Sequence, residues 1–191
     1  MKIKINGIHL DTGESLQEYV SAKLSPLVEK YFPSPIEGTV TFTKTGVFFH
    51  AEISVHAKRG VFLNSHADAD DIYVAFDQAS AKIEKRLRRH KNKIKDHSKK
   101  SEAADAIKIR YLVLNGTDYT ADEKDESLDK YPAIVAETPQ HIDALTVSEA
   151  VLRMDLGELP ALLFKNAAHG EFNMIYRRKD GNVGWIDPKN I

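Results

Sequence analysis

Hydrophobic and polar positions in the first third of the chain alternate with two different periods. Ile3 and Ile5 stand between lysines, which predicts a short strand at the start of the chain. Apolar residues then recur three and four positions apart over residues 16–31, the spacing of a helix with one apolar face. Pro26 falls inside this stretch, and because proline removes a backbone donor we expect a kink or a brief break there.

Three strands follow, according to the alternation of apolar and polar residues over 39–43, 49–56 and 61–68. Gly46 and Gly60 mark the turns between them. One face of these strands is apolar and the other is largely polar, a pattern typical of antiparallel strands that are covered on one side.

From about Asp70 the apolar spacing becomes helical again. A helix from Asp71 to about Asp96 would span close to 40 Å, which is more than a small sheet can cover. Its first half is apolar on one side and its second half is mostly basic, so we expect the last turns to project beyond the sheet.

The periodic pattern of apolar residues then becomes weak and resumes near the C-terminus. Residues 98–132 show no sustained period, apart from 107–114, which are compatible with an isolated strand. A strand is expected over residues 133–137, and the sequence Thr146 to Glu149 forms a capping box that opens a helix. Further strands are expected at the end of the chain, over residues 161–165, 172–178 and 183–186.

These elements predict an α+β protein in three parts. Residues 1–97 form a βαβββα domain with a four-stranded sheet and two helices on one face. Residues 98–132 form an acidic, flexible linker, in which the stretch 118–129 holds six acids and one lysine. Residues 133–191 form a small C-terminal α+β domain with a βαβββ-like order.

Composition excludes several classes of function. The chain has 191 residues and no cysteine, so it has no disulfide, no cysteine-ligated zinc and no thiol nucleophile. Phosphate-binding glycine loops and the common hydrolase motifs are absent from the sequence. No apolar run approaches the roughly 20 residues of a membrane span. We therefore expect a soluble, cytoplasmic protein that is not an enzyme and needs no cofactor.

Charge is distributed unevenly along the chain. Residues 1–100 hold 17 basic and 12 acidic residues, whereas residues 101–191 hold 10 and 16. Residues 82–100 alone contain ten basic and two acidic residues. Like charges at helical spacing repel one another, so a polyanion is the natural partner of this segment. RNA is favoured over DNA, because no helix-turn-helix pattern precedes the basic helix.

Two alternatives from other classes remain open. The first is a protein-binding regulator, such as a modulator of transcription, that does not bind RNA. The second is a metal-dependent enzyme, whose ligands would come from side chains on the polar face of the sheet: His50, His56, His66, Asp68 and Asp70. The simpler interpretation is that these side chains are polar residues on a solvent-exposed face of the sheet. No metal site is predicted.

Two segments carry a resemblance to a known family. The run Asp71-Ile72-Tyr73-Val74-Ala75-Phe76-Asp77, followed by Lys82-Ile83, Leu87, His90-Lys91, Lys93, Lys95 and His97, resembles the signature of ribosome hibernation promoting factors. The tail from Val147 to Gly184 is similar to the C-terminal domain of their long form. The stretch 156–160 departs from the longer, more aromatic stretch of many relatives.

This resemblance implies a factor that binds ribosomal RNA (16S rRNA) in the messenger and transfer RNA channel of the small ribosomal subunit and inhibits translation. It assigns RNA binding to ten basic residues: Lys58, Arg59, Lys82, Lys85, Arg86, Arg88, Arg89, Lys91, Lys93 and Lys95. It also implies a homodimer of the C-terminal domain that pairs two ribosomes. DNA and membranes are not expected partners.

The C-terminal domain has a physical reason of its own to dimerise. A domain of 59 residues has a marginal core, so association commonly adds stability. Its strands carry apolar residues at consecutive positions, so both faces present apolar groups and one face needs a partner. The residues expected at the dimer contact are Leu162, Phe164, Phe172, Met174, Tyr176 and Trp185.

Overall fold

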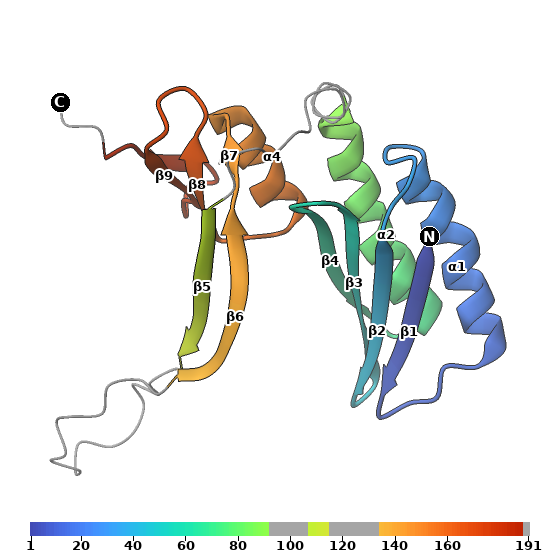
Figure 1. Ribbon diagram of the computed structural model, residues 1–191. Helices are drawn as coiled ribbons and strands as arrows, with labels where there is room; N and C mark the ends of the chain where they lie inside the picture. Colours follow the sequence, from blue (N-terminus) through green and yellow to red (C-terminus); the bar gives the residue numbers. More distant parts are fainter. Residues whose placement is uncertain (92–106, 115–133, 189–191) are drawn as a thin grey trace, which may run out of the picture.

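The computed structural model describes residues 1–91, 107–114 and 134–188 (Figure 1). The N-terminal domain has the predicted βαβββα order. Its elements are β1 (Lys2–Ile8), α1 (Glu14–Glu29), β2 (Glu37–Thr45), β3 (Phe48–Lys58), β4 (Val61–Ala69) and α2 (Ile72–Arg89). The four strands form one sheet in the order β1-β2-β3-β4, in which β1 and β2 are parallel and the other pairs are antiparallel. This confirms the predicted α+β class of the domain.

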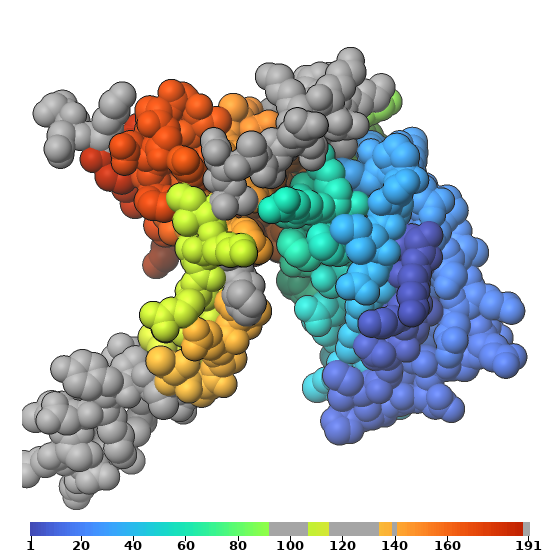
Figure 2. Space-filling model, viewed as in Figure 1, coloured from blue at the N-terminus to red at the C-terminus, as the bar shows by residue number. Residues whose placement is uncertain are grey.

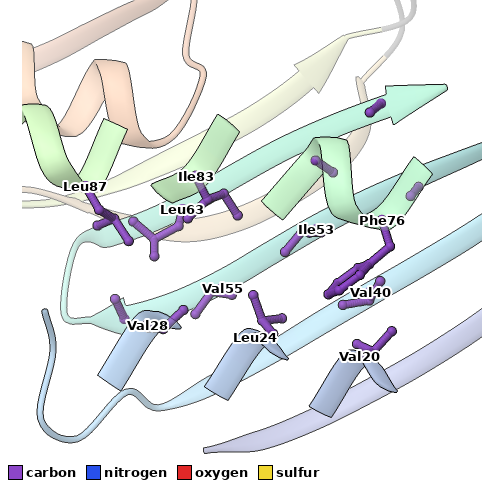
Figure 3. Close-up of a cluster of buried hydrophobic side chains, with 14 of the residues drawn as sticks. Val20, Leu24, Val28, Val40, Ile53, Val55, Leu63, Phe76, Ile83 and Leu87 are labelled. Atoms are coloured by element: carbon purple, nitrogen blue, oxygen red, sulfur yellow. The ribbon is translucent and has the colours of Figure 1, made fainter. Parts of the chain in front are cut away.

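The N-terminal core lies between one face of the sheet and the two helices (Figure 3). Cross-strand register places Val40, Ile53 and Ser65 side by side, so alternate residues of three strands face the same way. Leu24 of α1 and Phe76 of α2 are fully buried against this face. The period-two and helical patterns of the sequence therefore describe the two sides of a single core.

The two helices agree with the prediction only in part. α1 runs through Pro26 without a break, since the helix is continuous from Glu14 to Glu29. α2 begins where expected: Oδ1 of its N-cap residue Asp71 accepts hydrogen bonds from the backbone amides of Tyr73 and Val74 at 2.8 and 3.0 Å. It ends at Arg89, so its 18 residues span about 27 Å. The rest of the predicted helix, beyond residue 91, lies outside the described residues.

The C-terminal domain contains β6 (Ile134–Ile142), β7 (Ala144–Leu145), α4 (Val147–Leu156), β8 (Ala161–Asn166), β9 (Phe172–Arg177) and β10 (Val183–Ile186). The expected capping box is present, because Thr146 and Glu149 bond each other's backbone amides. One expectation is corrected. The first strand of the sheet, which has the order β10-β9-β8-β7, is the two-residue β7 and not the strand expected at 133–137.

The strand expected at 133–137 belongs to a different pair. β6 lies antiparallel to β5 (Ile107–Leu114), which falls inside the segment predicted to be a linker. The sequence allowed a strand at 107–114 but treated it as isolated, whereas the structure pairs it along its length. In Figure 2 this pair extends away from the rest of the C-terminal domain. The remainder of the predicted linker lies outside the described residues, and the domain boundaries stay predictions.

Helix α4 contributes to two cores at once. Ala150 and Met154 pack with Phe164 and Ile175 of its own sheet. Leu152 and Leu156 belong to the N-terminal core and are 2% and 1% exposed. Residues two apart on a helix point about 200° apart, so the two pairs occupy opposite faces of α4. The C-terminal domain is therefore packed against the N-terminal domain, beside β4 and α2 (Figure 1).

Candidate nucleic-acid interface

The basic side chains of α2 divide into two groups with different surroundings. On one flank, Nζ of Lys82 donates to the backbone carbonyl of His66 at 2.6 Å, and Nη1 of Arg86 donates to the carbonyl of Asn64 at 2.7 Å. Both acceptors belong to β4, the outer strand of the sheet. These two cations therefore satisfy the open edge of the sheet.

The same flank also meets two acids of the C-terminal domain. Arg86 forms an ion pair with Glu158, and Nη1 of Arg89 lies 3.2 Å from Oδ2 of Asp155. Nε2 of His90 lies 2.7 Å from the same oxygen. The hydrogen bond with His90, ahead of the nearby charge of Arg89, lowers the pKa of Asp155 from 3.8 to about 2.

The opposite flank of α2 faces solvent. Lys85 and Arg88 of α2, and Lys91 just beyond its end, are exposed, and none of them forms an ion pair with a residue in the described ranges. The side chain of Arg89 lies between the flanks and keeps 57% of its surface exposed despite its contact with Asp155. The negative C-terminal end of the helix dipole also stabilises cations in the last turn of a helix. Four cations at this end of α2 are thus accessible to a polyanion.

The remaining predicted RNA-binding residues have varied positions. Lys58 and Arg59 lie at the turn between β3 and β4; Arg59 is exposed, whereas Lys58 is half-buried. Burial, followed by the nearby charge of Arg153, lowers the pKa of Lys58. Lys93 and Lys95 lie outside the described residues.

The histidines of the outer sheet face have partners of other kinds. Nδ1 of His50 lies 2.8 Å from Oδ1 of Asp68, and the ring of His56 stacks on Phe62 at 4.5 Å between centroids. His66 contacts Glu158 at 3.2 Å. Within the described ranges, no three His, Asp or Glu side chains group as metal ligands do.

The six residues expected at a dimer contact lie on both faces of the C-terminal sheet. Phe172 and Met174 are exposed on the face opposite α4, together with the half-buried Tyr176. Leu162, Phe164 and Trp185 lie on the other face. Phe164 is a correction: it is fully buried under α4, so its side chain is unavailable to a second chain.

Sequence reasoning missed residues on the open face of the C-terminal sheet and residues that contact α2. Leu163 and Ile186 flank Met174 in the sheet register and are 49% and 50% exposed. Period-two alternation within each strand could have assigned them to the same face as Met174. Asp155 and Glu158 were also missed as partners of α2. Their partners lie 65 to 72 positions away in the chain, and only their charge hinted at the contact.

No helix in the described ranges is long and apolar enough to cross a membrane.

Comparisons with known proteins address both domains. A family model described as "Sigma 54 modulation protein / S30EA ribosomal protein" matches residues 3–95, and a model of its C terminus matches residues 129–184. The ribosome hibernation promotion factor of Rhizobium meliloti (strain 1021) is 36% identical over 100% of this chain and 99% of its own. That of Bradyrhizobium diazoefficiens is also 36% identical, over 98% of this chain and 95% of its own.

A solved structure, the N-terminal domain of Protein Y from Thermus thermophilus, is 27% identical. It covers 47% of this chain and 98% of its own, with a TM-score of 0.42. The two family models lie on the two folded domains, and the identity to the curated relatives runs the whole length of the chain. The chain therefore belongs to the Sigma 54 modulation protein / S30EA ribosomal protein family, as a long-form ribosome hibernation factor.

Proposed function

We propose that this protein binds RNA of the small ribosomal subunit in the channel used by messenger and transfer RNA and thereby inhibits translation. We further propose that a homodimer of its C-terminal domain pairs two idle ribosomes. The family consists of non-enzymatic, ribosome-associated factors, so the protein acts by occupying a site. A cytoplasmic location follows from this role and stays a prediction.

The exposed flank of α2 carries the proposal for RNA binding. Lys85, Arg88 and Lys91 are solvated cations without an acidic partner in the described part of the chain, and Arg89 stands beside them. Guanidinium groups match phosphate oxygens in a bidentate way, and ammonium groups add point charges. A rigid helix keeps these groups at fixed spacing, which suits a phosphate backbone of fixed fold.

Charge reversal on this flank tests the proposal. The double variant Lys85→Glu/Arg88→Glu should lose co-sedimentation with purified small subunits, because it replaces two attractive contacts with two repulsive ones. Both side chains are exposed, so the circular dichroism spectrum and the melting temperature should stay close to wild type. The control Lys108→Glu/Lys179→Glu changes the net charge equally, at exposed positions outside the N-terminal domain, and should still co-sediment. Equal binding by both variants would contradict the proposed interface.

The open face of the C-terminal sheet supports the proposal of a homodimer. Leu163, Phe172, Met174 and Ile186 expose between 36% and 50% of their surface on the face opposite α4. A contiguous set of large apolar side chains on one sheet face is unusual in a monomer, because its contact with water is unfavourable. A second copy of the same face would cover it with matching chemistry.

Two carboxylates on this face test the homodimer. The variant Leu163→Glu/Met174→Glu should sediment as a monomer in analytical ultracentrifugation, since burying four charges in a symmetric contact is costly. The control Val47→Glu/Val74→Glu adds the same charges at two exposed valines of the N-terminal domain and should remain dimeric. A dimeric Leu163→Glu/Met174→Glu variant would exclude this face.

A further inference from the structure

The contact between the two domains uses part of the surface assigned to RNA. α4 lies beside β4 and the C-terminal half of α2, with Leu152 and Leu156 inserted in the N-terminal core. At the rim of this contact, Nδ2 of Asn64 donates to the carbonyl of Gly157 at 3.0 Å. The two domains are thus held together by apolar packing and by directed hydrogen bonds.

Charge at this contact is complementary. Asp155 and Glu158 meet Arg89, His90 and Arg86, and both acids are mostly buried, with 15% and 25% of their side chains exposed. Nη2 of Arg177, from β9 of the same domain, lies 3.4 Å from Oδ1 of Asp155 and helps to orient it. Arg86 keeps only 17% of its side chain exposed. Two carboxylates therefore occupy positions beside α2 that suit phosphate groups.

We propose that this contact is an autoinhibited, closed form, in which Asp155 and Glu158 of the C-terminal domain compete with ribosomal RNA for the cations of α2. This inference rests on the RNA-binding role proposed above. RNA binds fully only after α4 leaves Arg86 and Arg89, so phosphate groups and the two carboxylates exclude one another. Carboxylate and phosphate present similar oxygen pairs to a guanidinium group, which makes the exchange chemically direct.

Closure leaves the other proposed interface accessible. Asp155, Glu158 and the two leucines face the N-terminal domain, whereas Leu163 and Met174 lie on the far face of the C-terminal sheet. The closed form therefore covers Arg86 and part of Arg89 without covering the dimer face. Two closed chains can pair before either one meets a ribosome.

Neutral replacements of the two acids test the competition. The full-length variant Asp155→Asn/Glu158→Gln should bind purified small subunits about 5- to 150-fold more tightly than wild type, the usual range of coupling between two linked equilibria. The control Glu171→Gln/Asp180→Asn removes the same two charges in turns of the C-terminal domain that do not touch α2, and should bind with wild-type affinity. This control separates release of α4 from a general gain of positive charge.

A cross-link provides a second test that does not depend on removing charge alone. The chain has no native cysteine, and the side chains of His66 and Glu158 are in contact. The variant His66→Cys/Glu158→Cys, treated with a short bis-maleimide before ribosomes are added, should form a cross-link within one chain. The locked protein should then bind small subunits more weakly than the same variant capped with N-ethylmaleimide.

The outcomes separate this inference from the function on which it rests. If the locked and the capped proteins bind equally well, or if the cross-link does not form within one chain, the closed form is overturned while RNA binding stands. Equal affinity of Asp155→Asn/Glu158→Gln and its control would overturn it as well. If no variant and no wild-type sample binds small subunits, the proposed function fails, and the competition fails with it.

Discussion

The Nε2 atom of His90, at the C-terminal end of α2, lies 2.7 Å from Oδ2 of Asp155 in α4, and both side chains are largely buried. This contact joins the two domains at the point where the basic helix ends. Its strength depends on the charge of the carboxylate, which connects domain packing to pH.

Acid should lower the free energy of unfolding, partly because it protonates Asp155. Because the pKa of this group falls to about 2 in the folded chain, its ionised form stabilises the fold above pH 3.8, and this contribution is lost as the pH falls toward 2. With solvent screening, we expect the loss to be about 1 to 2 kcal/mol. Urea unfolding between pH 6 and pH 2 should show a weaker pH dependence in Asp155→Asn than in wild type. Asp11→Asn, at an exposed position, should keep the wild-type profile.

Salt should weaken ribosome binding steeply. If 6 to 10 phosphates are engaged, affinity for small subunits should fall by about three to five powers of ten between 50 and 200 mM salt, by the scaling for duplex DNA. Arg88→Gln should reduce the slope of log affinity against log salt by about one, because one phosphate contact is lost. Lys179→Gln, on the C-terminal domain, should leave the slope unchanged. A flat response in wild type would instead favour the protein-binding regulator.

Leu156 should stabilise the N-terminal core although it belongs to the C-terminal domain. The side chain is 1% exposed, so Leu156→Ala should lower the free energy of unfolding by about 2 to 5 kcal/mol through lost burial and a residual cavity. Val47→Ala, at an exposed position of the N-terminal domain, should cost about 0.5 kcal/mol or less. Chemical denaturation monitored by circular dichroism gives both values. Similar losses in the two variants would mean that α4 does not pack against the N-terminal core in solution.

Removal of residues 133–191 should separate the two proposed activities. The shortened chain keeps α2 and the whole N-terminal sheet, so it should still bind single ribosomes and inhibit translation in a cell-free assay. It lacks the open sheet face and should no longer pair ribosomes in a sucrose gradient. Paired ribosomes in the presence of the shortened chain would show that the C-terminal domain is not the pairing element.

Local chemistry made much of the fold predictable. Asp71 caps α2 and Thr146 caps α4 because their side-chain oxygens satisfy amides two or three residues away, which a sequence pattern can reveal. Alternation in β3 and β4 likewise predicted which side chains enter the N-terminal core. Each of these signals acts over only a few residues.

Long-range contacts were beyond such reasoning. The two-residue strand β7 has no periodicity of its own and forms because β8 lies beside it. The apolar runs in β8 and β9 predicted two apolar faces correctly, but Phe164 faces α4 and Leu163 faces outward, a choice that depends on the register of the whole sheet. The pairing of Arg86 with Glu158 joins segments 72 positions apart, and no local rule selects it.

The double role of α4 limits how its sequence can vary. Of its ten residues, Ala150 and Met154 fill one core while Leu152 and Leu156 fill the other. A replacement that enlarges or shrinks any of these four side chains shifts the helix against both neighbours, so an adjustment that suits one domain disturbs the other. Mutational tolerance along this helix should therefore be restricted to its narrow polar borders, even though it spans fewer than three turns.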